Sequence, residues 1–290
     1  MANYYYDQPR GWKRYSEGVI PLLILLLIAV VLIGKTTPTF CGVPGLNQVL
    51  CTRTGEVHVG IIGTLTTGNT QIGAEKFKDI LDTQGAQYQV YYRDVSLDIL
   101  EYPREQMLEE FDLLIVTGET NLSYAQRDAV GNYLSAGGKV IVIGDAGTLD
   151  TNDPLVKGWS VASFGDNSPV RLDPKTSEQT GIPVRNVNNV ILTYWTTHSI
   201  LHDYADRYKL NLSEVATECG AIKVVDVEPM AESQVIALFQ GEDASGDSDH
   251  EFAIIERAAG ISGGKVLYFN YDPGCTRGIA FTSIRYLAGR

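Results

Sequence analysis

An uncharged and almost entirely aliphatic run near the N-terminus constrains this chain more than any other feature. It extends from Gly18 to Gly34, and its core consists of Leu, Ile, Val and Ala apart from Pro21. A helix of roughly 17–25 residues spans a bilayer, and the proline falls in the first turn, where a missing N–H costs little. No small-x-small cleavage site or lipobox follows, so the sequence predicts an uncleaved transmembrane helix over residues 18–34 rather than a signal peptide.

Positive charges flank the apolar run asymmetrically. Arg10, Lys13 and Arg14 precede it closely, whereas only Lys35 follows it closely. By the positive-inside rule, residues 1–17 stay in the cytoplasm and the chain beyond the helix is exported. We therefore expect a single-pass protein of the cell membrane with an extracytoplasmic C-terminal part.

The cysteines and two sequons are compatible with this orientation. All the cysteines follow the apolar run, and their even number predicts two disulfides among Cys41, Cys51, Cys219 and Cys275. Three pairings are open; Cys41–Cys51 is the pair nearest in sequence and would leave Cys219–Cys275 inside the body. A zinc site of four thiolates is the alternative, but no pair has C-x2-C spacing. The sequons give two candidate glycosylation sites, Asn121 and Asn211.

The charge of the chain is distributed unevenly along the sequence. The net charge of −12 combines +3 in residues 1–55, from five bases and two acids, with −15 in residues 56–290, from 18 bases and 33 acids. An acidic body repels phosphate backbones, and no basic stripe with interleaved aromatic residues is present. We therefore expect no nucleic-acid partner.

A stalk over residues 35–55 precedes the body, residues 56–290, whose first part alternates strand and helix patterns. Strands are expected at 57–62, 87–92, 112–117 and 139–144. Helices are expected at 72–81, near 104–110 and at 123–134, where Ser123 and Gln126 form a capping-box pattern. This alternation predicts an α/β, flavodoxin-like fold with an open, mainly parallel sheet and helices on both faces.

The alternation of strand and helix patterns ends after Asp145. Residues 148–190 are rich in Asp, Asn, Pro and Gly and indicate a loop-rich insertion. Strand-like runs then return, and a closing helix is expected over 276–287. The runs cover residues 189–194, 221–227, 234–240, 252–257 and 265–270.

Four segments of the body resemble one known family. Phe111–Gly118, followed by a helix and by Tyr133–Gly144, is similar to the strand, helix, Gly-Gly, strand core of the class I glutamine amidotransferase-like superfamily. Thr197–His202 and Gly263–Asn270 are similar to a His-Pro-Ile segment and a closing strand of its trehalose-utilisation-like and membrane-anchored relatives. The resemblance implies a flavodoxin-like fold more directly than a reaction.

The same resemblance implies that the active site has been lost. Working members place a Cys nucleophile on the elbow after the strand that is Val140–Ile143 in this chain, where Gly144, Asp145, Ala146 and Gly147 stand instead. The His-x-Glu pair of the family corresponds to Asn270-Tyr271-Asp272, which contains no His to act as a base. Because a carboxylate is a far poorer acyl nucleophile than a thiolate, we expect no amidotransferase activity.

Polar residues follow the expected parallel strands, where ligands bind in such sheets. The candidate ligand-binding residues in these loops are Thr64, Thr66, Thr67, Asn69, Glu119, Asn121, Asp145 and Thr148. The first loop has the glycine spacing of an anion-binding turn but lacks the Lys of a P-loop, and tight turns alone explain such glycines more often than nucleotide binding does.

Two further groups are weak candidates for metal binding. His198 and His202 are four residues apart with Asp203 and Asp206 nearby, but Ser199 stands where a zincin needs Glu. His198 is also a ligand-binding candidate. The acidic run that includes Asp247, Asp249 and Glu251 could hold Ca²⁺, although a solvated hairpin explains it better. No other cofactor is expected.

The preferred functional hypothesis is a single-pass, membrane-anchored and catalytically inactive amidotransferase-like ectodomain. It would bind a partner protein, a second copy of itself or an envelope glycan. The first alternative is an extracytoplasmic hydrolase or metal-dependent sugar-modifying enzyme that uses Asp145, Glu119 and His198. The second is a structural subunit of a surface filament or membrane complex, because Gly18–Leu23 faintly resembles the start of archaeal pilin helices.

Overall fold

The computed structural model describes residues 56–66, 68–101, 110–151, 158–159, 162–172, 182, 184–194, 198–202, 214–242, 248–259 and 262–289. Residues from Glu56 onward form one compact unit. The predicted transmembrane helix over 18–34, the stalk, and Cys41 and Cys51 lie outside the described residues. Within the described ranges, no helix is both long and apolar enough to cross a membrane.

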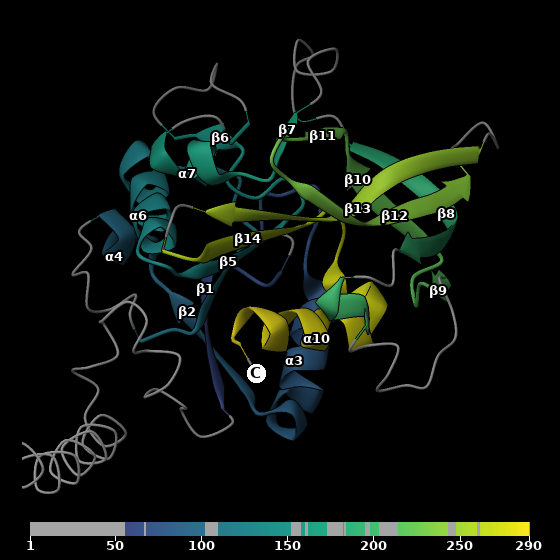
Figure 1. Ribbon diagram of the computed structural model, residues 1–290, viewed down its shortest axis with the longest axis horizontal. Coiled ribbons are helices and arrows are strands. Elements are labelled where there is room, and N and C mark those ends of the chain that lie inside the picture. The colour runs from purple at the N-terminus through teal and green to yellow at the C-terminus, as the bar shows by residue number, and fades with distance from the viewer. Residues whose placement is uncertain are drawn as a thin grey trace, which may run out of the picture. The chain divides into compact units, whose positions relative to one another are not determined.

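Figure 1 shows the helices and strands of the described part of the chain. They are β1 (Val57–Gly63), α3 (Glu75–Tyr88), β2 (Val90–Val95), α4 (Leu97–Glu101), β3 (Leu113–Thr117), β4 (Asn121–Leu122), α6 (Tyr124–Ser135), β5 (Lys139–Ile143), β6 (Leu149–Asp150), α7 (Ala162–Asn167), β7 (Val170–Leu172), β8 (Val184–Tyr194), β9 (Glu214–Ala216), β10 (Ala221–Val225), β11 (Val227–Pro229), β12 (Gln234–Glu242), β13 (Ser248–Ala259), β14 (Gly264–Phe269), η2 (Pro273–Thr276) and α10 (Arg277–Leu287).

A single large sheet combines a parallel half with an antiparallel half. Its order is β10-β8-β12-β13-β14-β5-β3-β1-β2, with β9 beside β8. The strands from β14 to β2 are parallel, whereas β13, β12, β8 and β10 continue the sheet in antiparallel pairings. The α/β, flavodoxin-like architecture is confirmed, and the later strand-like runs extend the same sheet, which makes it mixed.

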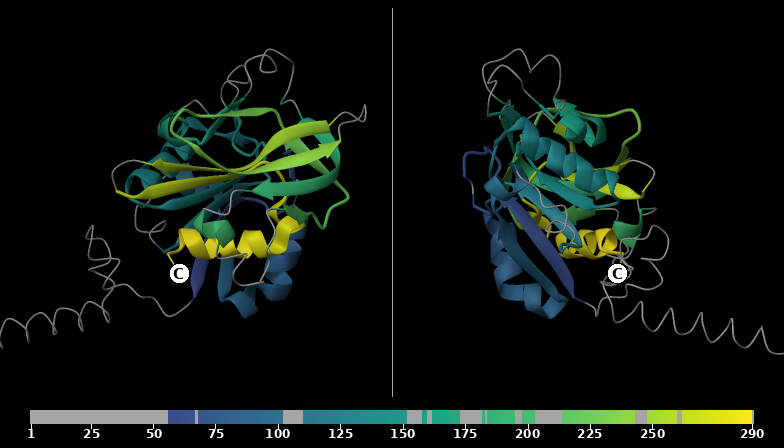
Figure 2. Two further views of the ribbon diagram at one scale, coloured as in Figure 1. Left: turned by 45° about the vertical axis from the view of Figure 1, so that its right-hand side comes forward. Right: turned by 90° about the vertical axis from the view of Figure 1, so that its left-hand side faces the viewer.

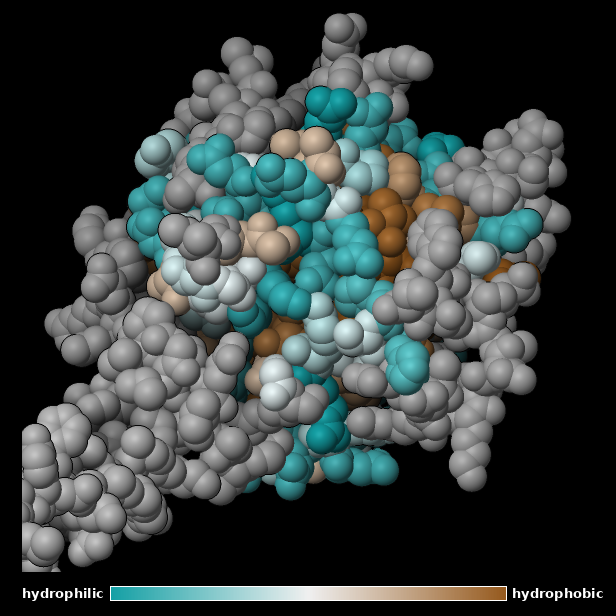
Figure 3. Space-filling model, viewed as in Figure 1, coloured by the Kyte–Doolittle hydropathy of each residue, from teal (hydrophilic) through white to brown (hydrophobic). Residues whose placement is uncertain are grey.

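Helices cover both faces of the parallel half. Helices α3 and α10 lie on one face and α4, α6 and α7 on the other (Figures 1 and 2). Strands β3 and β5 are therefore buried almost throughout, which explains their uninterrupted aliphatic sequences. The face shown in Figure 3 is mainly hydrophilic where its residues are described, with apolar residues in small patches.

Local signals predicted one helix start correctly and one strand start incorrectly. Helix α6 begins after Ser123, whose Oγ accepts a hydrogen bond from Gln126 N, while Gln126 Oε1 accepts one from Ser123 N at 2.8 Å. This confirms the capping box. By contrast, α3 continues through Tyr88 into the expected strand at 87–92, ends at Gln89 with a φ of 57°, and leaves β2 to start at Val90.

Two other expectations concern the helix near residues 104–110 and the insertion over residues 148–190. Residues 102–109 lie outside the described residues, so the helix expected near 104–110 stays a prediction, and the structure adds α4 at Leu97–Glu101 before them. The expected insertion contributes β6, α7 and β7, and β8 begins within it. Buried Trp159 connects it to the body by donating a hydrogen bond from Nε1 to the carbonyl oxygen of Ala146 at 2.9 Å.

Candidate functional site

The loops after β1, β3 and β5 meet at the carboxyl edge of the parallel half. Thr64 N donates to Thr117 O at 3.0 Å, Asn69 N to Gly118 O at 3.1 Å, and Gly147 N to Glu119 O at 2.8 Å. The first two loops touch so closely that a Cβ atom on Gly68 would lie 1.9 Å from Gly118 O. Glycine is therefore required at this crossing for space as well as for its φ of 55°.

Most of the predicted polar residues lie together here, and several hold one another in place. Asn69 Nδ2 donates to Glu119 Oε1 at 2.5 Å, and Asn69 Oδ1 accepts from Thr120 N at 2.6 Å. Glu119 Oε1 also accepts from Asn121 N at 2.9 Å, and the hydroxyls of Thr64 and Thr66 are 2.8 Å apart. These contacts fix the Glu119 side chain at the edge. Thr67 lies outside the described residues.

An open hollow of about 490 Å³ lies beside this group. The ends of β1, β2 and β3 contribute its lining, which consists of Gly63, Thr64, Asp94, Val95, Ser96, Leu97 and Glu119. This lining includes two carboxylates, two hydroxyls and the apolar side chains of Val95 and Leu97, and none of the described lining residues is Lys or Arg. Such a lining suits a neutral hydroxyl-rich group or a cationic group and disfavours an anion.

Asp94 and Ser96 in this hollow are not among the residues predicted from the sequence. Both follow from the position of β2, which was expected at 87–92 and ends three residues later, at Val95. With the correct register, Asp94 and Ser96 flank the end of the strand. The signal that could have found them is the apolar Val90 and Val95 at the two ends of the strand.

Asp145, at the expected nucleophile elbow, is a structural residue in this fold. It is 1% exposed and its carboxylate accepts hydrogen bonds from Gln71 N at 2.8 Å and Ile72 N at 3.0 Å. Burial raises the pKa of Asp145, and these two backbone donors oppose that rise. A Cβ atom on Gly144 would lie 2.5 Å from Ile72 Cβ, so the elbow is packed shut.

Neighbouring elbow residues are also enclosed. Ala146 is fully buried and offers no nucleophile. Buried Thr148 donates its hydroxyl to the carbonyl oxygen of Asp145 at 2.6 Å. The described elbow therefore carries neither a thiol nor a free hydroxyl that could attack a substrate.

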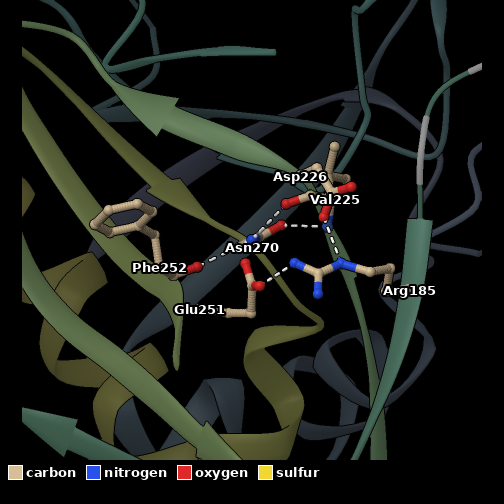
Figure 4. A network of polar contacts seen from close by, with 6 residues as sticks. All are labelled: Arg185, Val225, Asp226, Glu251, Phe252 and Asn270. Carbon is tan, nitrogen blue, oxygen red and sulfur yellow. Dashed lines mark hydrogen bonds and ion pairs between the residues drawn. The ribbon is translucent and has the colours of Figure 1, made fainter. Parts of the chain in front are cut away.

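The second position implied by the resemblance is also occupied by structural side chains. Asn270 is fully buried, and its Nδ2 donates to Val225 O and Phe252 O, both at 2.9 Å, while its Oδ1 accepts from Val225 N at 2.7 Å (Figure 4). Asp272 accepts from the backbone N–H groups of Lys76, Phe77 and Gly274. Burial raises the pKa of Asp272 against these donors.

The antiparallel half closes over this end of the edge. Lys223 Nζ on β10 donates to Gln71 O at 3.4 Å, and Glu218 N donates to Cys275 O at 2.8 Å. A disulfide joins Cys219 to Cys275, with a Cα–Cα distance of 5.3 Å. This confirms the pairing of these two cysteines, and it ties the segment before β10 to η2.

His198 lies in a different part of the sheet from Asp145 and Glu119. Its Nε2 is 2.9 Å from Glu256 Oε2, and its Nδ1 accepts from Ile200 N at 3.3 Å, which assigns the proton donated to Glu256 to Nε2. Glu256 also bonds Tyr286 and Lys265, near the amino end of β14, whereas Asp145 follows the carboxyl end of β5.

The possible metal ligands are also dispersed. The described residues contain no group of three or more His, Cys, Asp or Glu side chains that could hold a metal ion. His202 is exposed, while Asp203, Asp206 and Asn211 lie outside the described residues.

The acidic run lies in the hairpin between β12 and β13, where Glu242 pairs with Ser248. Asp247 lies outside the described residues, and Asp249 is described only as part of β13. Buried Glu251 forms an ion pair with Arg185, which also pairs with Asp226 (Figure 4). The Glu251 carboxylate therefore neutralises an arginine and contributes to the antiparallel half.

Comparisons with known proteins place this geometry within a known fold. No family model matches the chain. It is similar to a β-galactosidase from Bacillus circulans sp. alkalophilus at 10% identity and a TM-score of 0.53, over 84% of this chain and 32% of that one. A ThuA-like protein from Bacteroides uniformis ATCC 8492 is similar at 13% identity and a TM-score of 0.50, over 81% of this chain and 92% of that one.

A third solved structure, the glutaminase domain of CTPS from Trypanosoma brucei, has 13% identity and a TM-score of 0.43, over 80% of this chain and 94% of that domain. The chain spans about a third of the length of the β-galactosidase. At such identities the likeness concerns the fold. The β-galactosidase and the ThuA-like protein thus share their fold with this chain.

Proposed function

We propose that this chain is a single-pass, membrane-anchored protein whose exported amidotransferase-like domain is catalytically inactive and binds a partner protein or an envelope glycan. The observation that carries the proposal is the use of Asp145. Its carboxylate holds the N–H groups of Gln71 and Ile72 where the family places a nucleophile, and Asn270 and Asp272 are used in the same way at the second position.

Two further features support the location and the mode of action. The buried Cys219–Cys275 disulfide is typical of an oxidising compartment, in agreement with the charge asymmetry around residues 18–34. The hollow lined by Thr64, Asp94 and Glu119 is the part of the carboxyl edge that the antiparallel half leaves open. It supplies carboxylate and hydroxyl groups that can bind sugar hydroxyls or a basic side chain.

Catalytic inactivity is tested on the full-length chain in detergent micelles. We expect no hydrolysis of glutamine, chromogenic glycosides or simple esters above the buffer rate. Asp145→Asn and Asp272→Asn form a matched pair, because both remove a buried carboxylate that accepts backbone N–H groups. Turnover that Asp145→Asn abolishes and Asp272→Asn preserves would identify Asp145 as a catalytic group and contradict the proposal.

Export is tested with a reporter enzyme that is active only in an oxidising compartment and is fused to the C-terminus. We expect an active reporter on the wild-type chain. Replacing Arg10, Lys13 and Arg14 with Asn removes the charge asymmetry and should lower reporter activity severalfold. Arg285→Gln, a charge change within the body, serves as the control. An inactive wild-type fusion would place the body in the cytoplasm.

A further inference from the structure

A second hollow lies at the edge of the sheet formed by β2. It encloses about 140 Å³, and its lining consists of His58, Val59, Tyr91, Tyr92, Arg93, Glu110 and Phe111. Strand β2 ends the sheet order and pairs with β1 alone among the described strands, as its position in Figures 1 and 2 shows. The hollow therefore lies at the side of the sheet, apart from the residues that line the carboxyl-edge hollow.

Aromatic rings form the floor of this hollow. His58 is opposite Tyr91 in the strand register, and their rings stack with centroids 6.2 Å apart. Gly60 is opposite Arg93 and has no side chain, and a Cβ atom there would lie 3.0 Å from the Phe111 ring. Phe111 thus packs directly over the backbone of Gly60 and extends the aromatic surface across β1.

An ion pair provides polar groups at the rim. Arg93 Nη2 is 2.8 Å from Glu110 Oε2, and the Arg93 guanidinium lies over the Phe111 ring at 5.1 Å from its centroid. Both charged side chains are more than half exposed, at 61% and 57%. The pair thus offers guanidinium donors and carboxylate acceptors beside the aromatic floor.

Tyr91 is exposed to solvent on this edge strand. It is 44% exposed on a strand whose neighbour β1 is mostly buried, and it is one of three large apolar side chains exposed in the described part of the chain. Isolated exposed rings are common on protein surfaces. An exposed ring in a hollow beside two other rings and an ion pair is typical of a recognition surface.

We propose that the surface formed by His58, Tyr91, Phe111, Arg93 and Glu110 binds a single pyranose unit of a glycan. This inference rests on the proposed function and specifies the glycan as the ligand class. One face of a pyranose ring carries C–H groups with a slight positive charge, which complement the negative face of an aromatic ring. Its hydroxyls both donate and accept, so they can bond to both members of the Arg93–Glu110 pair.

A proline-rich peptide is the other class of ligand that aromatic grooves accept. The carbonyl oxygens of such a peptide could accept hydrogen bonds from Arg93. They could not bond to the Glu110 carboxylate, because both groups are acceptors. The donor and acceptor pair therefore favours a sugar. The acidic body further disfavours anionic ligands such as nucleic acid.

The proposal is tested by saturation-transfer NMR and affinity electrophoresis on the full-length chain in detergent. The probes are hexasaccharides of glucose, mannose, galactose and N-acetylglucosamine. We expect at least one probe to bind, Tyr91→Ala to weaken its binding about tenfold or more, and Tyr91→Phe to retain it. Tyr124→Ala is the matched control, because Tyr124 is 58% exposed on α6, outside the hollow.

Each contrary outcome has a separate meaning. A probe whose binding responds to Glu119→Gln and not to Tyr91→Ala would move glycan binding to the carboxyl-edge hollow, overturning this inference and leaving the proposed function intact. Binding of a decaproline peptide through Tyr91, with no hexasaccharide bound, would overturn the glycan assignment, as would the binding of neither probe. Thermal unfolding of every variant shows whether a loss of binding reflects a loss of fold.

Discussion

The two ends of the carboxyl edge show how one fold can use similar residues differently. At the β5 and β14 end, Asp145, Asn270 and Asp272 are buried or nearly so and bind backbone groups of neighbouring segments. At the β1 to β3 end, Asp94 and Glu119 line an open hollow. The difference arises because residues 71–77 and strands β10 and β13 pack against the first end and leave the second accessible.

Residue type alone does not distinguish the polar residues that stabilise the fold from those that are available to bind a ligand. Carboxylates are present at both ends. Those at the closed end satisfy N–H groups that would otherwise be buried without partners, which costs about 1–3 kcal/mol per group. Those at the open end remain in contact with solvent, so their substitution should affect binding more than stability.

The largest expected effect concerns the covalent link that holds the closed end together. The Cys219–Cys275 disulfide encloses a loop with a sequence separation of 56 residues. The chain-entropy model gives a stabilisation of about 4 kcal/mol for a loop of this length. The Cys219→Ser/Cys275→Ser variant should lose about that much free energy of unfolding in a denaturant titration.

Hydrogen exchange shows whether the loss is focused on the closed end. Faster exchange at Gln71, Ile72 and Val225, with little change at Asn121, is the expected pattern. Destabilisation below about 1 kcal/mol, or an even increase in exchange across the sheet, would mean that the disulfide does not hold the antiparallel half over the edge.

The next largest effect compares two asparagines at opposite ends of the edge. Asn270→Ala removes the partner of Val225 N–H and of two buried carbonyl oxygens, so we expect a loss of about 3 kcal/mol in the free energy of unfolding. Asn69→Ala also removes several hydrogen bonds, but Asn69 is exposed and water can replace them. Its expected cost is about 1 kcal/mol.

Similar losses for the two asparagine variants in parallel urea titrations would erase the distinction between the closed and open ends. A large loss for Asn69→Ala would instead show that the Asn69–Glu119 contact is a structural element. In that case Glu119 would no longer count as a residue available for binding.

The sequence predicted the fold where the local signals agreed with the tertiary contacts. The aliphatic runs at β3 and β5, and Ser123 with Gln126 at the start of α6, led directly to the parallel half. The alternation at residues 87–92 misled because Gln89 ends α3 in a left-handed conformation, which no local pattern in this sequence marks.

From the sequence, the candidate site could be predicted only as a set of loops that follow the parallel strands. Strand order brings Thr64, Asn69 and Glu119 together, and sequence analysis placed all three at one edge of the sheet. Which of the edge residues are buried depends on contacts between positions far apart in the chain, such as those of Asp145 with residues 71–72 and of Asn270 with β10. Hydrophobic periodicity reflects local structure, so it does not predict contacts between residues that are far apart in the sequence.

The smallest expected effect is a pH dependence of stability that arises from Asp145 at the closed end. Burial raises the pKa of Asp145 in the folded state, against the opposing N–H groups of Gln71 and Ile72. A raised carboxyl pKa contributes stability that is fully present below the unfolded pKa and is lost as the pH rises through the folded pKa. The wild-type chain should therefore lose stability relative to Asp145→Asn, which does not titrate, as the pH rises from about 4 to 7.

Urea titrations across this pH range measure the difference, for which we expect about 1 kcal/mol. Glu256 provides a control of opposite sign. Although burial raises its pKa, hydrogen bonds from His198 and Lys265 lower the pKa below its ordinary value, so its contribution is lost as the pH falls. If the wild-type and Asp145→Asn profiles ran parallel across this range, burial would not raise the pKa of Asp145, and the closed end would not be closed.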